Sequence, residues 1–276
     1  MKKVRYREGH LVSELNRAQK CVMIMFLILE GILTFLPMWN VIVVSTTTAL
    51  ESTRSGVVLW WREFSLEGFE YVFKVSKLGR PFFNSLIVTT VGTVIQVFLS
   101  SIAGYVLVQP NLPFRGVITS FVMLTMMIPG DLTMISIYQL NRDLSLLNTY
   151  SGLIINGLIS GFSIMLMRNY FESISYTLAE AARIDGASEL RIFAGVFIPI
   201  SLPGLATVFF MEYAGKWHSI TIPAAILTTS SVSGTAQIPD NAIMAAIVIS
   251  AVPLLLFYVF VQRFLLSGLN LGATKE

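Results

Sequence analysis

The amino-acid sequence predicts an all-α membrane protein with about six transmembrane helices. Hydrophobic residues make up 54% of the 276 residues, only 13% are charged, and the mean hydropathy is +0.72. Soluble globular domains carry about a quarter charged residues, so this composition excludes an ordinary soluble domain. Apolar runs also recur along the chain at lengths near the roughly 20 residues that a helix needs to cross a bilayer.

Short polar segments separate these apolar runs. The candidate spans are Cys21–Ser45, Phe82–Val108, Phe114–Gln139, Gly152–Met167, a run from near Pro199 that fades before Trp217, and Ala242–Val261. The first run is too long for a signal-peptide core and lacks a small-residue cleavage site, so we expect a retained span. Within the third run, residues 129–131 (Pro-Gly-Asp) predict a kink near its outer end; the alternative is a helix break of the kind that marks binding sites in transporters.

The basic residues predict the orientation of the spans, because lysine and arginine are enriched in short cytoplasmic loops. Residues 1–20 are rich in lysine and arginine, which places the N-terminus in the cytoplasm, ahead of a transmembrane domain over residues 21–276. With six alternating spans, Arg115, the segment around Arg183 and Arg263 fall on the same side. We therefore expect both termini in the cytoplasm, with a C-terminal tail over residues 264–276.

Two segments are expected outside the membrane. Residues 46–81 carry Trp60 and Trp61 ahead of apolar positions that suggest a small interfacial helix, and seating in the lipid headgroups and docking of a partner remain open for it. Residues 221–240 contain no lysine or arginine. The stretch from Thr228 to Gln237 predicts a flexible polar loop.

The cytoplasmic segment between the fourth and fifth spans, residues 169–199, is too long for a simple turn. It predicts two short helices that are broken at Gly186, with Ser188 as the N-cap of the second helix and Pro199 opening the next span. Small alanines let a helix seat closely on another surface, and the charged residues can pair at its rim. The segment is therefore a candidate docking lever on the cytoplasmic face.

The residues of this segment resemble a known motif. Glu180-Ala181-Ala182, three further residues, Gly186, nine further residues and then Val196-Phe197-Ile198-Pro199 resemble the EAA loop of binding-protein-dependent ABC importer permeases. The family pattern ends in Ile-x-Leu-Pro, and this chain has valine and isoleucine at the two aliphatic positions. The ending Ser267–Glu276 is similar to the maltose-type, multiple-sugar branch. Trp60-Trp61 and the residues after them resemble its complex-oligosaccharide subgroup.

The resemblance implies a permease subunit of an ATP-driven carbohydrate importer in a bacterial cytoplasmic membrane. It implies a second permease, two ATPase subunits and an extracellular or periplasmic solute-binding protein as partners, with membrane lipid around the chain and an oligosaccharide as substrate. The residues that couple to an ATPase would be Glu180, Ala181, Ala182, Asp185, Gly186 and Lys275. A family loop between the last two spans enters the binding protein, which implies such a contact for Thr228, Ser231 and Gly234.

Catalysis by the chain itself is not expected. There is no Gly-x-x-x-x-Gly-Lys-Ser/Thr phosphate loop, so we expect no cofactor here and place ATP and Mg²⁺ on the ATPase subunits. Neither His10 nor His218 has a second ligand at metal-binding spacing, so no metal site is expected. A net charge of +3 without a basic stripe excludes nucleic acid as a partner. The alternatives are the same family serving a non-sugar solute and a membrane-embedded enzyme.

Polar residues inside the apolar runs are candidates for the substrate pathway, because polar groups are costly in lipid. Hydrogen bonds between helices are the competing explanation for each of them, and lipid contact competes for the aromatic candidates Tyr105 and Phe162, which are suited to stacking on sugars. The pathway candidates are Glu30, Asn84, Gln96, Tyr138 and Asn156.

Overall fold

The computed structural model describes residues 16–54, 56–74, 78–232 and 238–273, and these form helices joined by turns. Among them the only extended pairing is an isolated antiparallel bridge between Thr47 and Phe64. The all-α prediction is therefore confirmed. The chain divides into two compact units, residues 1–72 with 235–248 and residues 73–234 with 249–276, which are described separately below.

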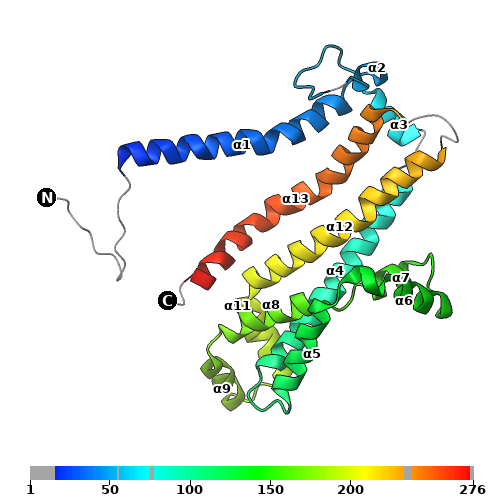
Figure 1. Ribbon diagram of the computed structural model, residues 1–276. Coiled ribbons are helices and arrows are strands. Elements are labelled where there is room, and N and C mark those ends of the chain that lie inside the picture. The colour runs from blue at the N-terminus through cyan, green and yellow to red at the C-terminus, as the bar shows by residue number, and fades with distance from the viewer. Residues whose placement is uncertain (1–15, 55, 75–77, 233–237, 274–276) are drawn as a thin grey trace. The chain divides into compact units, whose positions relative to one another are not determined.

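The first unit contains helices α1 (Arg17–Ser45) and α2 (Ala49–Ser52), most of α3 (Glu67–Lys74), and the first turns of α13 (Asp240–Ala273) (Figure 1). Helix α1 is apolar around its whole circumference, and its most apolar window is 0% buried. A helix that is apolar on every side is stable only against lipid or other protein surfaces. This agrees with a membrane span.

Indole hydrogen bonds hold the segment after α1 against that helix. Trp39 Nε1 donates to the carbonyl oxygen of Leu59 at 2.9 Å, and Trp61 Nε1 donates to Thr46 Oγ1 at 2.7 Å. These bonds fix residues 58–61 in an irregular conformation, and the small helix predicted for this segment forms after the two tryptophans. Helix α3 begins only at Glu67.

The second unit contains α4 (Gly79–Val108), α5 (Arg115–Met127), α6 (Gly130–Asp143), α7 (Tyr150–Ile155), α8 (Gly161–Glu172), α12 (Leu202–Val232) and the rest of α13. Helix α4 packs along α8 and α12, and α5 packs on α8 (Figure 1). Glycines allow these close approaches: a Cβ at Gly104 would lie 2.9 Å from the backbone nitrogen of Arg168, and one at Gly204 would lie 2.4 Å from Tyr170 Cγ.

Two of the expected continuous spans are broken. The third run forms α5 and α6, and the axes of the helices over Arg115–Met127 and Leu132–Asp143 differ by 100°, so a mere kink was a wrong prediction. Pro129 explains the break, because it offers no N–H and forces Ile128 into an extended conformation with ψ of 115°. The fourth run forms α7 and α8, and residues 156–160 between them lie outside both helices.

The fifth span is longer than predicted, because α12 continues from Leu202 to Val232. Trp217, where the run was expected to fade, is 2% exposed and donates a 2.7 Å hydrogen bond to the carbonyl oxygen of Ser250. Residues 228–232 are consequently helical rather than part of a loop, and Gly234 lies outside the described residues. Three described helices are long and apolar enough to cross a bilayer, or up to five spans if each bent pair counts as one.

Candidate functional site

The segment that follows α8 contains the two short helices predicted from the sequence. Helix α9 spans Tyr176–Ile184, and Gly186, whose φ of +80° lies in the left-handed region, follows two residues later. Helix α10 (Glu189–Ile192) begins three residues after this glycine. Ser188 occupies the predicted N-cap position, although its side chain accepts no capping hydrogen bond from a described residue. A π-helical turn over Phe193–Phe197 and the short α11 (Ile198–Ile200) then lead to α12.

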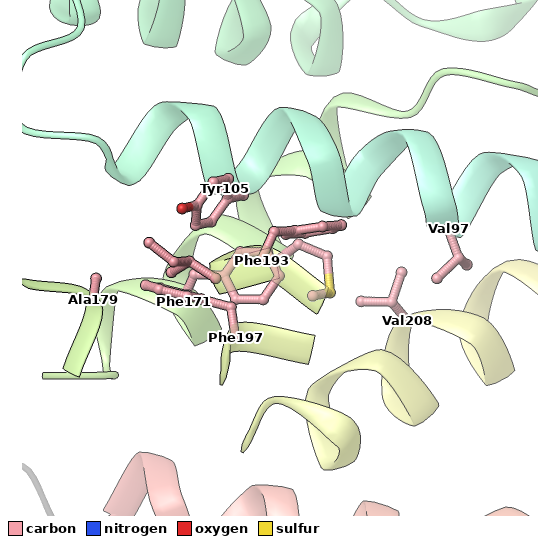
Figure 2. Packing of buried hydrophobic residues seen from close by; sticks show 9 residues of the cluster. Val97, Tyr105, Phe171, Ala179, Phe193, Phe197 and Val208 are labelled. Atoms are coloured by element: carbon pink, nitrogen blue, oxygen red, sulfur yellow. The ribbon is translucent and has the colours of Figure 1, made fainter. Parts of the chain in front are cut away.

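An aromatic cluster anchors the inner side of this segment. The Tyr105 ring on α4 lies 4.9 Å from the Phe197 ring and 5.2 Å from the Phe193 ring, measured between centroids, and Phe171 on α8 closes the cluster (Figure 2). Ala179, which is 0% exposed, brings α9 onto the same cluster. Aromatic pairs at such distances add to the stabilisation from their buried area. The segment is thus packed on the bundle.

A polar network lies next to the aromatic cluster. The Tyr105 hydroxyl donates to Glu189 Oε2 at 2.7 Å, and Arg183 Nε donates to Glu189 Oε1 at 2.6 Å. Arg183 also donates to the Tyr176 hydroxyl at 2.6 Å and to Gln109 Oε1 at 3.1 Å. The hydrogen bond with Glu189 raises the pKa of the Arg183 guanidinium, so it remains cationic. The network joins the end of α4 to both sides of the Gly186 break.

The outer side of α9 is open to solvent in the isolated chain. The predicted coupling residues Glu180, Ala181, Asp185 and Gly186 are exposed and Ala182 is half-buried. Two large apolar side chains are exposed beside them: Ile184 is 87% exposed and Leu190 is 79% exposed. Exposed apolar side chains in a charged rim are typical of a surface that another protein covers. The structure therefore brings the EAA residues together on one short segment, while Lys275 lies outside the described residues.

Sequence reasoning missed Tyr105 and Arg183 as members of this site. Tyr105 was a candidate for stacking on a sugar, with lipid contact as the alternative, and it is instead 7% exposed within the aromatic cluster. Its contact with Glu189 joins positions 84 residues apart. No local sequence pattern indicates such a pair, because only the tertiary packing of α4 on the segment creates it.

The pathway candidates differ in their exposure. Glu30 on α1, Tyr138 on α6 and Asn156 at the end of α7 are exposed, and Asn84 on α4 is half-buried. Gln96 is 2% exposed and accepts a hydrogen bond from the Lys216 ammonium group. Phe162, the other aromatic candidate for sugar stacking, is 43% exposed on α8.

A second polar cluster lies within the bundle of the second unit. Glu212 and Lys216, one turn apart on α12, form an ion pair of 3.6 Å between Nζ and Oε2, with side chains 18% and 15% exposed. Ser163 on α8 donates to Glu212 Oε1. Sequence reasoning missed this pair because the fifth span was expected to fade here, although opposite charges four residues apart within an apolar run are a readable signal. No group of three potential metal ligands occurs among the described residues.

Long apolar helices, a polar segment anchored on the bundle and an ion pair packed among apolar helices are typical of a multi-pass membrane protein. Residues 96–270 match the family model of the binding-protein-dependent transport system inner membrane component, and the chain belongs to this family. It is a multi-pass protein of the bacterial inner membrane. The match covers α9 and both polar clusters.

Individual relatives span almost the whole chain. The polygalacturonan/rhamnogalacturonan transport system permease protein YtcP of Bacillus subtilis (strain 168) is 29% identical, over 94% of this chain and 99% of its own. The arabinooligosaccharides transport system permease protein AraQ of Halalkalibacterium halodurans is 28% identical, over 87% of this chain and 90% of its own. A chain from the crystal structure of a bacterial ABC transporter involved in the import of the acidic polysaccharide alginate has the same fold, with a TM-score of 0.78 and 24% identity over 92% of this chain and all of that chain.

Proposed function

We propose that this chain is one permease subunit of an ATP-driven carbohydrate importer and that it forms half of the translocation pathway. The observation that carries the proposal is the segment around Gly186, which is anchored on the bundle by Tyr105 and Glu189 and open on its outer side at Ile184. A membrane span needs no such helix, whereas a transport subunit driven by a separate ATPase does. Membership of the family and relatives that are named as sugar-polymer permeases support this assignment.

Helix α9 would seat in a cleft of an ATPase subunit that carries ATP and Mg²⁺. Ile184 and Leu190 provide the apolar contact, and Glu180 and Asp185 provide charges at the rim. Because Arg183 and Glu189 tie the segment to Tyr105, a displacement of α9 reaches α4 without being absorbed at the Gly186 turn. Closure of the ATPase subunits would thereby move the bundle between its inward-facing and outward-facing states.

The remaining parts of the assembly follow from the same assignment. Six spans would place both termini in the cytoplasm, with Lys275 in a tail that reaches the ATPase subunits. A second permease would complete the pathway, and a solute-binding protein would deliver the carbohydrate to the outer side. Thr228, Ser231 and Gly234 would contact that protein. Thr228 and Ser231 lie on the last turns of α12 rather than on the flexible loop expected from their composition, and Gly234 lies outside the described residues.

The test is reconstitution of the complete complex in liposomes with its solute-binding protein. Uptake of radiolabelled arabinotriose, trigalacturonate and diacetylchitobiose is measured with ATP or with a non-hydrolysable analogue inside. We expect ATP-dependent uptake of at least one of these sugars, and none when this chain is omitted. A complex that hydrolyses ATP and imports none of the panel would contradict the assignment to carbohydrate and favour a different solute.

A further inference from the structure

The cluster around Lys216 has a feature that the coupling mechanism does not use. Lys216 extends along two glycines: a Cβ at Gly157 would lie 3.0 Å from Lys216 Cε, and one at Gly92 would lie 3.7 Å from it. Gly157 belongs to residues 156–160, which separate α7 from α8. The ammonium group therefore lies beside a break in a membrane helix.

Helix geometry places this cluster deep in the bilayer. Gln96 precedes Tyr105 by nine residues on α4, which corresponds to about 14 Å along the helix axis. Ser163 precedes Phe171 by eight residues on α8, or about 12 Å. Gln96 also lies near the middle of α4, a helix long and apolar enough to cross a bilayer, and this position corresponds to the middle of a hydrocarbon core about 30 Å thick.

The break is also exposed on the surface of the chain. Asn156 is exposed, and Ile159 is 77% exposed. The N–H groups of Gly157 and Leu158 still donate to the carbonyl oxygens of Ile154 and Ile155, in turns rather than in a continuous helix. Irregular backbone at membrane depth is tolerated only where protein buries it or where it lines a water-filled cavity. The Glu212–Lys216 ion pair also cannot face lipid at this depth, because ionisable side chains within a membrane face the bundle interior or water. Two independent observations thus exclude lipid from this face.

The face of α4 next to the pair is polar as well. Thr89, Thr93 and Gln96 lie about one turn apart on one side of the helix, and each is at most 2% exposed. The hydroxyl groups of Thr89 and Thr93 have no hydrogen-bond partner among the described residues. Buried hydroxyls without partners are costly, which favours a cluster that water or a polar ligand reaches in another state of the transporter.

We propose that Lys216, Glu212 and residues 156–160 form a saccharide-binding site in the translocation pathway. The ammonium group donates and the carboxylate accepts, a combination that matches the neighbouring hydroxyl groups of a sugar ring through charge-assisted hydrogen bonds. The Asn156 amide adds a donor and an acceptor from the exposed side. The inference rests on the proposed function and assigns to this chain a share of the substrate contacts.

The first experiment measures access to Asn156 in the complete importer. In a Cys21→Ser background, which removes the only cysteine of the chain, Asn156→Cys is treated with a charged, membrane-impermeant methanethiosulfonate. Val208→Cys, at a position on α12 that is 1% exposed, is the matched control. We expect labelling of Asn156→Cys alone, reduced about tenfold by the transported sugar at about ten times its Kd. No labelling, or labelling that sugar does not reduce, would overturn the proposal.

The second experiment removes both charges together with Glu212→Gln/Lys216→Met. This double variant leaves no unpaired buried charge, so the complex should still assemble. We expect the KM for sugar uptake to rise at least about tenfold, the loss equivalent to one charge-assisted hydrogen bond, while the binding protein still stimulates ATP hydrolysis. An unchanged KM would show that the pair only holds helices together. If the wild-type complex imports no sugar of the panel, the proposed function fails instead.

Discussion

The Tyr105 hydroxyl donates a 2.7 Å hydrogen bond to Glu189 Oε2 and so joins a membrane helix to the segment that carries the EAA residues. The opposite oxygen of the same carboxylate accepts from Arg183 on α9. One carboxylate therefore joins α4, α9 and α10 across the Gly186 turn. Without it, α9 would keep the packing of Ala179 on the aromatic cluster and the Arg183 hydrogen bond to Gln109, but α10 would lose its hydrogen bond to α4.

Tyr105→Phe tests this connection with the smallest change. The ring stays in the aromatic cluster, but Glu189 loses one of its donors, and a hydrogen bond to a charged group contributes about 1.5–3 kcal/mol. We expect a lower unfolding midpoint of the detergent-solubilised complex and more ATP hydrolysed per sugar imported. Tyr150→Phe, at a position that is 51% exposed, is the control. Equal behaviour of the two variants would show that the Tyr105 hydroxyl transmits nothing.

Gly186→Ala tests the left-handed turn. No described atom lies within 4 Å of the added Cβ, so the cost comes from the backbone at φ of +80° and amounts to about 1–2 kcal/mol. Because asparagine tolerates this conformation better, Gly186→Asn should lose less uptake than Gly186→Ala. The reverse order, measured as initial uptake rates at equal amounts of assembled complex, would argue against a strained turn.

Gly204→Ala tests the packing of α12 on α8. The new methyl group would overlap the Tyr170 ring, so this ring or one of the helices must shift, and overpacking of this kind typically costs about 1–3 kcal/mol. We expect a reduced yield of assembled complex on size-exclusion chromatography. Gly215→Ala on the same helix meets no described atom within 4 Å and should assemble normally. Tyr170→Leu should partly rescue Gly204→Ala, and a lack of rescue would point to another cause.

Lys216→Met alone tests the energetics of the buried ion pair. It leaves Glu212 as an uncompensated charge at membrane depth, a change that costs about 3–5 kcal/mol in buried pairs. We expect the single variant to be depleted from the membrane fraction and the double variant with Glu212→Gln to recover. Normal levels of the single variant, measured by immunoblot, would mean that water already solvates Glu212.

The sequence predicts the local structure around Gly186 better than it predicts the spans. The break at Gly186 is readable because a glycine, a serine at the N-cap position and a spaced proline act locally. The bend after Met127 and the gap between α7 and α8 were misjudged because hydropathy is the same for a straight helix and for a broken one. Trp217 was taken for a membrane boundary, yet its hydrogen bond to Ser250 buries it between two helices.

The contacts that define the candidate sites depend on tertiary packing. Tyr105 reaches Glu189 because its ring packs against aromatic rings from α8 and from the π-helical turn. No sequence periodicity indicates this packing. Gln96 was singled out for its polarity, but its partner Lys216 lies 120 residues further along the chain. The residue types were therefore predictable, whereas their pairing was not.

Charge reversal at Glu180 tests most directly whether an ATPase drives this chain through α9. Glu180 is exposed and makes no contact that holds the fold of the described residues, so Glu180→Lys should insert and assemble like the wild type. Sugar uptake and ATP hydrolysis are measured in the same proteoliposomes. The account predicts that uptake is lost while ATP hydrolysis no longer responds to the sugar-loaded binding protein. Uptake at the wild-type rate with normal stimulation would contradict it.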